Sequence, residues 1–184
     1  MSTSSSRIKT LAAPALALAR SLASSLASSL AGSLIFATAA HAAGTVQVDF
    51  VEPAKYADAG HGTRDIERTT QALGDYLKSL GKKLPDGQVL SVAVTDIDLA
   101  GELRPTRNGN EVRVVRGRAD WPSMKMRWTL TQDGRSIKSA EDKLADMNYT
   151  NSTVALRSSE PFIFERHMID RWFSEQVTGT AAAR

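Results

Sequence analysis

The segment Val89-Leu-Ser-Val-Ala-Val-Thr-Asp-Ile-Asp-Leu99 constrains the fold of this chain more than any other part of the sequence. It is rich in β-branched residues, which fit the pleated and packed environment of a sheet. It is also long enough to be buried on one or both faces. We therefore interpret it as the central strand of a β-sheet, against which the other elements pack.

A second strand is predicted before this segment and two strands after it. Residues 45–51 alternate apolar and polar side chains, which indicates a half-buried strand. Glu111–Arg118 and Met124–Gln132 are predicted to follow as strands, and the alternation in the latter is regular. The side chains expected to point inward from it are Met124, Met126, Trp128 and Leu130. Those expected to point outward are Lys125, Arg127 and Thr129.

A tight turn is predicted at Asp133-Gly134, because glycine accepts the positive φ that short hairpin turns require. The turn leads into a further strand over Ser136–Leu144. Together with the two preceding strands it would form a three-stranded meander. The last three strands are therefore expected to be neighbours in one antiparallel sheet.

Two helices complete the predicted fold. Residues 64–80 place apolar side chains on one side at helical spacing, and Gly81 and Pro85 end that helix. A second helix is predicted near the C-terminus, with Pro161 in its first turn and a broad apolar face from Phe164 to Phe173. The order β-α-β-β-β-β-α predicts a single α+β domain with a mostly antiparallel sheet of about five strands and both helices on one face. The first and central strands flank a helix, so they are expected to pair in parallel through a right-handed crossover.

The N-terminal residues predict a secretory signal peptide. Arg7 and Lys9 precede a Leu/Ala/Ser-rich run over residues 11–36, and cleavage motifs end at Ala39 and at Ala42, of which the second is preferred. We assign residues 1–42 to the signal peptide, residues 43–177 to the domain and residues 178–184 to a flexible tail. The alternative, a membrane anchor, is disfavoured because Arg20 and the serines interrupt the apolar run. The expected location is the bacterial periplasm or the outside of the cell, without a transmembrane anchor after cleavage.

Removal of the signal peptide changes the charge balance of the chain. Residues 1–42 hold three of the 23 Lys and Arg residues and none of the 20 Asp and Glu residues, which leaves 23 − 3 = 20 basic against 20 acidic. The usual inference from a basic chain to a nucleic-acid partner therefore fails. The chain has no cysteine, which excludes disulfides, thiol catalysis, thiolate metal sites and the lipidated cysteine of a lipoprotein.

Four segments together resemble a known bacterial family. They are Val94–Glu102, Asp120-Trp-Pro122 with the strand after it, Lys143–Tyr149 and Phe164–Phe173. This combination is similar to the exported family catalogued as domain of unknown function 3016. The resemblance implies an exported single domain and brings no activity, substrate or cofactor with it.

The densest acid cluster consists of Asp96, Asp98 and Glu102. Alternation places the two aspartates on one face of the central strand, where paired carboxylates could share a metal or perform acid–base chemistry. The calcium-loop pattern fails, because it would need oxygen ligands where Ala100 and Arg107 stand. The structural interpretation, which we favour, is that the three acids pair with Arg104 or with basic residues of neighbouring strands.

Basic side chains form a second candidate site. Arg116, Arg118, Lys125 and Arg127 could make a stripe on the outer sheet face that binds an anionic partner, and Arg113 joins it only if a bulge intervenes. The favoured alternative is a solvated face that is partly balanced by acids of the next strand. These acids are Glu141 and Asp142.

The polar loop after Met147 is a third candidate site, opened by Asp146 and Tyr149. Tyr149 could equally cap the edge of the core with its hydroxyl in water. His61 and His167 lie in different elements, so no zinc site is expected, and no cofactor motif is present.

We therefore expect a non-catalytic binding or envelope-associated module whose partner is a protein or an anionic component of the envelope. The alternative is a small hydrolase-like enzyme, with Asp96 or Asp98 as base and Glu102 as acid. In that enzyme Arg104 or Arg113 would orient an anionic substrate.

Overall fold

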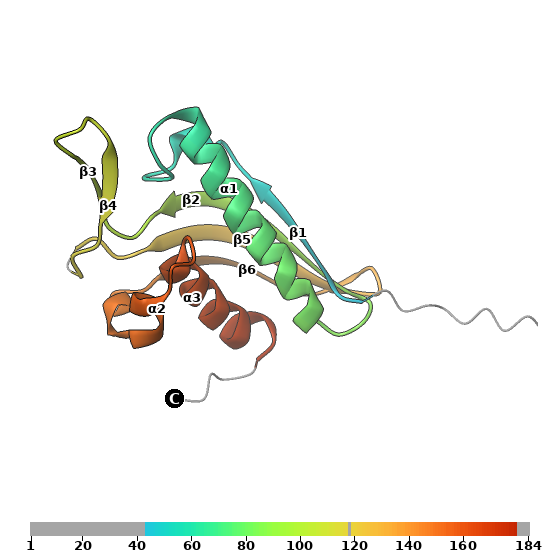
Figure 1. Cartoon of the computed structure of the whole chain (residues 1–184). Coiled ribbons are helices and arrows are strands. Elements are labelled where there is room, and N and C mark those ends of the chain that lie inside the picture. Colours follow the sequence, from blue (N-terminus) through green and yellow to red (C-terminus); the bar gives the residue numbers. More distant parts are fainter. Residues whose placement is uncertain (1–42, 118, 180–184) are drawn as a thin grey trace, which may run out of the picture. The chain divides into compact units, whose positions relative to one another are not determined.

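The sheet is built from four strands in the order β1-β2-β5-β6 (Figure 1). A computed structural model describes residues 43–117 and 119–179, so the predicted signal peptide, Arg118 and residues 180–184 lie outside the described part. The strands are β1 (Thr45–Phe50), β2 (Gln88–Asp98), β5 (Ser123–Gln132) and β6 (Arg135–Ala145). β1 runs parallel to β2, and β5 is antiparallel to both β2 and β6. The predicted central strand and its parallel pairing are confirmed.

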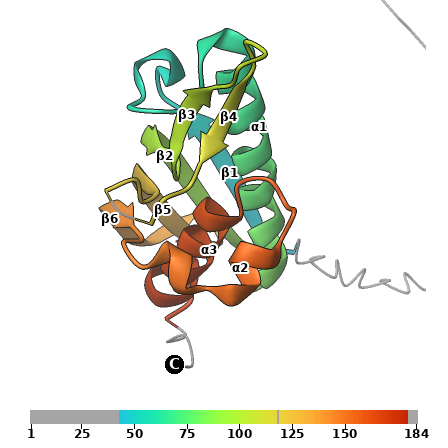
Figure 2. The same cartoon turned by 60° about the vertical axis from the view of Figure 1, so that its left-hand side comes forward.

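The predicted meander has two strands instead of three. Residues Glu111–Val114 form β4, which pairs with β3 (Glu102–Pro105) in a separate hairpin. The reason is that β5 already pairs with β2 on one side and with β6 on the other, so it has no free edge for a third partner. The β3–β4 hairpin therefore projects beyond the end of the main sheet (Figures 1 and 2).

The turn between β5 and β6 is as predicted. Asp133 has φ 50° and Gly134 has φ 78°, the left-handed conformation that such two-residue turns require. A β-bulge, by contrast, was not predicted: the register of β2 against β5 shifts between Val94 and Asp96. Because of this shift the inward positions change from Val94 to Ile97, and Asp96 turns to the outer face of the sheet.

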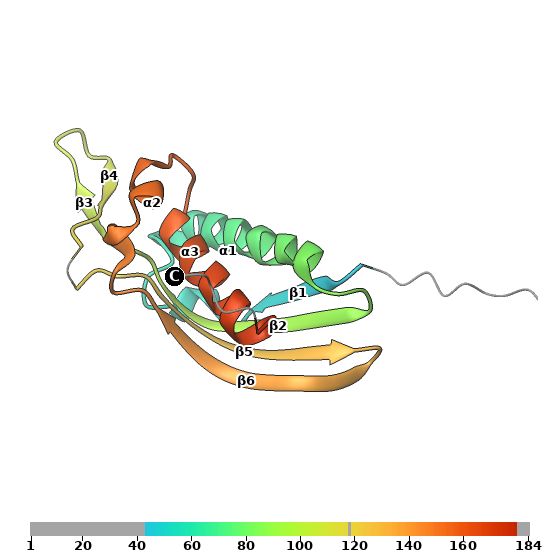
Figure 3. The same ribbon diagram turned by 90° about the horizontal axis from the view of Figure 1, so that it is seen from below.

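Two helices cover one face of the sheet and leave the other face bare (Figure 3). They are α1 (Gly62–Ser79), which matches the predicted range 64–80 within two residues, and α3 (Ile163–Trp172), which is the helix predicted near the C-terminus. The short α2 (Thr153–Arg157) precedes α3, and a π-helical turn (Phe173–Val177) continues it. Pro161 lies outside α3, because Phe162 caps the helix in the left-handed conformation. Among the described residues, no helix combines the length and apolarity needed to cross a membrane.

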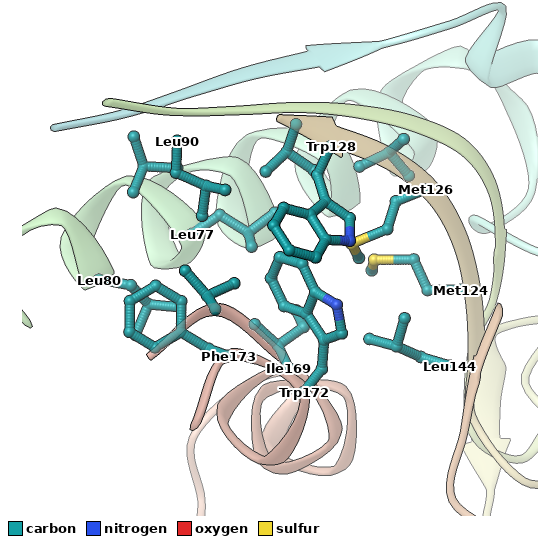
Figure 4. Close-up of a cluster of buried hydrophobic side chains, with 14 of the residues drawn as sticks. Leu77, Leu80, Leu90, Met124, Met126, Trp128, Leu144, Ile169, Trp172 and Phe173 are labelled. Atoms are coloured by element: carbon teal, nitrogen blue, oxygen red, sulfur yellow. The ribbon is translucent and has the colours of Figure 1, made fainter. Parts of the chain in front are cut away.

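The core lies between the sheet and these helices (Figure 4). The predicted inward side chains of β5 are all buried. The rings of Trp128 and Trp172 meet edge to face with centroids 5.7 Å apart. Asp142 also points inward, and its Oδ2 accepts hydrogen bonds from the indole nitrogens of Trp128 at 2.7 Å and Trp172 at 2.9 Å. The expectation that Asp142 balances charge on the outer face was therefore wrong.

Candidate ligand-binding cleft

A cleft of about 800 Å³ lies at the end of the sheet where β2 leaves it. Its walls come from three parts of the chain: the N-terminal half of α1, the β3–β4 hairpin, and the segment that runs from α2 into α3. These elements belong to one compact unit of the chain. The volume is within the range of small-molecule binding sites.

Arg113 fastens the hairpin to the rest of the domain at the base of the cleft. Its Nη1 lies 2.9 Å from Oδ2 of Asp58, and its Nη2 lies 3.1 Å from Oδ1 of the same residue. Nη1 also donates to the carbonyl oxygen of Gly101 at 2.9 Å. Because about three quarters of each side chain is buried, this bidentate pair holds β4 in place.

Glu165 is a buried acid in the lining of the cleft. It lies in the first turn of α3, is 3% exposed, and accepts a hydrogen bond from the Ala100 N–H on Oε1 at 2.8 Å. Burial raises the pKa of Glu165 above its ordinary value, although the Ala100 hydrogen bond and nearby Arg113 act in the opposite direction. The environment therefore favours the protonated, uncharged form of this side chain.

Thr69 is the second buried polar side chain in the lining. It lies on the face of α1 that points to the core and is 2% exposed. The hydroxyl of its neighbour Thr70, by contrast, donates to Ile66 O within the helix. Because Thr69 lines the cleft, its hydroxyl is placed to hydrogen-bond with a molecule that occupies the cleft.

Phe162 supplies part of the wall in a strained backbone conformation. Its φ of 57° and ψ of 34° lie in the left-handed region, which bulky side chains rarely adopt. Such strain persists only where the surroundings enforce it, and it is concentrated at functional sites. The location of the strain at the cleft is therefore consistent with a binding role for this wall.

The three predicted acids lie apart from the floor of the cleft. Asp96 pairs with Lys125, Nζ to Oδ2 at 2.8 Å, and accepts a second hydrogen bond from the Ala57 N–H at 2.9 Å. Partial burial opposes ionisation of Asp96, but these two hydrogen bonds outweigh it and hold its pKa below the ordinary value. Glu102 pairs with Arg104 at the surface of the hairpin. Burial, reinforced by Asp58 and Asp96, raises the pKa of Asp98.

The predicted basic stripe is divided between different surfaces. Lys125 is paired with Asp96, and Arg127 stands opposite Glu141 on the outer face of the sheet. Arg116 follows β4 and lines the cleft, and Arg118 lies outside the described residues. Arg113 lies on the β3–β4 hairpin, where it binds Asp58, and is therefore separate from the four-stranded sheet. A second concavity, of about 490 Å³, lies beside Arg127, lined also by Asp49, Ser91 and Ser139.

The predicted loop residues have structural partners. Asp146 lies 3.4 Å from the Arg171 guanidinium and also accepts from the Asn148 N–H. Tyr149 is 2% exposed; its hydroxyl donates to Asp120 at 2.9 Å and accepts from the Gly117 N–H at 3.1 Å. Tyr149 therefore joins the loop to the chain after β4 and is bonded within the protein instead of facing water.

Sequence reasoning missed Thr69, Glu165 and Asp58. The first two carried a usable signal, because each stands on the apolar stripe of its helix: Thr69 four residues before Leu73, and Glu165 four residues before Ile169. A polar residue at a core-facing helical position needs an explanation. Asp58 lies in an irregular segment and carried no such signal.

No group of three or more His, Cys, Asp or Glu side chains that could hold a metal ion occurs among residues 43–117 and 119–179. The comparison with protein families gives one result: the family described as "Protein of unknown function (DUF3016)" matches residues 44–175. The chain belongs to the DUF3016 family. This match confirms the resemblance inferred from the sequence, and the cleft lies within the part of the chain that the DUF3016 family covers. No curated protein and no solved structure matches the chain.

Proposed function

We propose that this DUF3016 protein is an exported, non-catalytic binding module of the bacterial envelope, and that its ligand occupies the cleft beside Glu165. The observation that carries the proposal is the pair of buried polar side chains, Thr69 and Glu165, in the lining of one cleft. Ligand-binding sites typically combine an apolar lining with a few polar groups that fix the orientation of the ligand. Loops and helix ends around a rigid sheet are also common positions for binding sites.

Export is supported by the N-terminal segment and by the composition. The basic start, the apolar run and the Ala-x-Ala motif that ends at Ala42 match a cleavable signal. The equal numbers of acidic and basic residues after Ala42 give no reason to expect a nucleic-acid partner. The envelope is therefore the compartment in which we place the ligand or partner.

Binding is favoured over hydrolysis by the pairing of the candidate acids. A general base must be free to take a proton from the substrate. Asp96 is instead hydrogen-bonded to Lys125, and Glu102 to Arg104. Asp98, the other candidate base, does not line the cleft, and neither do Asp96 and Glu102, so the cleft does not bring the predicted base and acid together.

Matched substitutions that fill each concavity test this proposal. Ser159 lines the cleft, Ser139 lines the concavity on the bare sheet face, and both are exposed. The protein, Ser159→Trp and Ser139→Trp are incubated with an envelope extract and repurified, and retained molecules are identified by mass spectrometry. We expect a molecule that the wild type and Ser139→Trp retain and that Ser159→Trp loses. Retention by Ser159→Trp and loss by Ser139→Trp would place binding on the sheet face. Chemical conversion of the retained molecule by the protein would support the alternative of a hydrolase-like enzyme.

Export is tested separately by expression of the full chain in a Gram-negative host. We expect the protein in the periplasmic fraction with an intact mass that corresponds to a chain starting at Ala43. Cleavage at the other motif would leave Ala40 as the first residue, and the intact mass distinguishes the two products. An uncleaved protein in the cytoplasm would contradict the proposed location.

A further inference from the structure

We propose that the cleft selects a ligand with an apolar body and an uncharged hydrogen-bonding head, such as an amide, over ligands with an anionic or a cationic head. This inference rests on the proposed function and specifies the class of ligand. It follows from three features of the cleft: the arginine at its base is already bonded within the fold, its floor carries two buried polar side chains, and its wall is apolar.

The guanidinium at the base of the cleft is already satisfied. Arg113 binds both carboxylate oxygens of Asp58 and the carbonyl oxygen of Gly101. An anionic head would have to compete with Asp58, which is held in a bidentate geometry. The arginine that was expected to meet an anionic partner is therefore used within the fold.

The other buried side-chain polar groups of the lining are the hydroxyl of Thr69 and the carboxyl of Glu165, whose pKa is raised by burial. The Thr69 hydroxyl can donate one hydrogen bond and accept others. Glu165 uses Oε1 to accept from Ala100 N–H, so a proton on its other oxygen is directed to a different acceptor. Two such groups suit a carbonyl, amide or hydroxyl of the ligand, whereas an anionic head placed against them would be buried beside an arginine that is already bonded to Asp58.

The wall above these groups is apolar and partly open to solvent. Leu156 is 55% exposed and Val115 is 37% exposed, and both line the cleft. Phe162 and Ile163 continue this wall toward α3. Exposed apolar side chains grouped at a cavity provide the area that an apolar ligand body can bury.

Charges of both signs surround the apolar wall. Arg68 and Arg116 contribute positive charge, while Asp65, Glu111 and Glu160 contribute negative charge. Glu160 is paired with Arg166, and Oε2 of Glu111 lies 3.0 Å from Nδ1 of His61. A mixed rim gives no net attraction for one sign of ligand, so selection depends on the polar groups inside.

Three probes with the same ring test the inference: benzamide, benzoate and benzylamine. Each is titrated into ¹⁵N-labelled protein, purified after expression of the full chain, and backbone amide shifts are followed by NMR. We expect benzamide to shift the amides of Thr69, Ala100 and Glu165, and both charged probes to bind at least about tenfold more weakly because their heads would be buried unpaired. Benzoate binding as tightly as benzamide, or no probe shifting these amides, would overturn the inference.

A matched pair of substitutions on α1 localises the contact. Thr69→Val keeps the shape and removes the hydroxyl, so benzamide affinity should fall about fivefold, as expected for loss of one hydrogen bond. Thr70→Val is the control, since Thr70 is outside the lining of the cleft. Glu165→Gln, which keeps a donor and an acceptor, should retain benzamide binding. Equal affinity in Thr69→Val and wild type would contradict the inference, while the result of the Trp substitutions would still decide the proposed function.

Discussion

Arg113 and Asp58, 55 residues apart, form two parallel hydrogen bonds of 2.9 and 3.1 Å. Asp58 lies in the segment between β1 and α1, and its backbone also bridges to β2 at Asp98. The pair therefore connects the projecting hairpin to the parallel part of the sheet. Because the hairpin supplies one wall of the cleft, the shape of the cleft depends on this contact.

We expect Arg113→Gln to lower the free energy of unfolding by about 2 kcal/mol, between the values typical of exposed and of buried ion pairs. The reason is that Asp58 would stay partly buried without its partner. Urea denaturation followed by circular dichroism measures the change. Arg104→Gln on the same hairpin is the control, and it should lower the free energy by less than about 0.5 kcal/mol because its pair is exposed. Equal effects of the two substitutions would show that the Arg113 contact does not hold the hairpin.

Asp142→Ala should be among the most destabilising polar substitutions, at about 3 kcal/mol, because it leaves two indole N–H groups without an acceptor. Both Trp128 and Trp172 donate to the same Asp142 oxygen. Glu141→Ala changes the preceding residue, which faces outward, and should lower the free energy of unfolding by less than about 0.5 kcal/mol. Thermal unfolding followed by tryptophan fluorescence compares the two. A small effect of Asp142→Ala would mean that water replaces the carboxylate.

The elements that were predicted correctly are those whose pattern lies within a short stretch of the sequence. The β-branched run over residues 88–98, the alternation from Met124 to Leu130 and the Asp133-Gly134 turn each identify their element without reference to the rest of the chain. The partner of Glu111–Val114 could not be predicted in this way, because pairing depends on which strand edges other elements leave free. The inward position of Asp142 could have been read by alternation from Leu144.

The site was harder to predict because its polar groups come from three separate elements. Sequence reasoning selected clusters of like residues, such as Asp96 and Asp98, which the fold places in ion pairs or on partly solvated positions. The buried groups Thr69 and Glu165 are isolated polar residues within apolar stripes. Their proximity to one cleft follows only from the packing of α1 and α3, which a local pattern does not contain.

Asp96→Asn should lower stability at neutral pH and have little effect in acid. Hydrogen bonds from Lys125 and the Ala57 N–H hold the pKa of Asp96 below its ordinary value, so the ionised form stabilises the fold. That stabilisation is present above the ordinary pKa of aspartate and is lost as pH falls through the lowered value. The urea midpoints of wild type and Asp96→Asn, measured from about pH 7 down to about pH 2, should converge. A difference between the two urea midpoints that stays constant across this range would contradict the conclusion that ionised Asp96 stabilises the fold.

Glu165→Gln should show the opposite dependence on pH. Burial raises the pKa of Glu165, so above the ordinary glutamate value the folded state retains a proton that the unfolded state has released. The stabilisation from the protonated acid is complete below the ordinary pKa and is lost as pH rises through the raised one. Glutamine has no proton to lose, so the stability of Glu165→Gln relative to wild type should increase between about pH 4 and about pH 8.

Urea denaturation at these two pH values measures the Glu165 effect, with Glu141→Gln as the exposed control that should show no such trend. A difference between Glu165→Gln and wild type that stays constant or shrinks toward the higher pH would mean that the carboxyl is ionised in the folded protein. In that case the cleft would contain a buried negative charge beside Arg113. Its preferred ligand would then be a cation, and the benzylamine titration would show it independently.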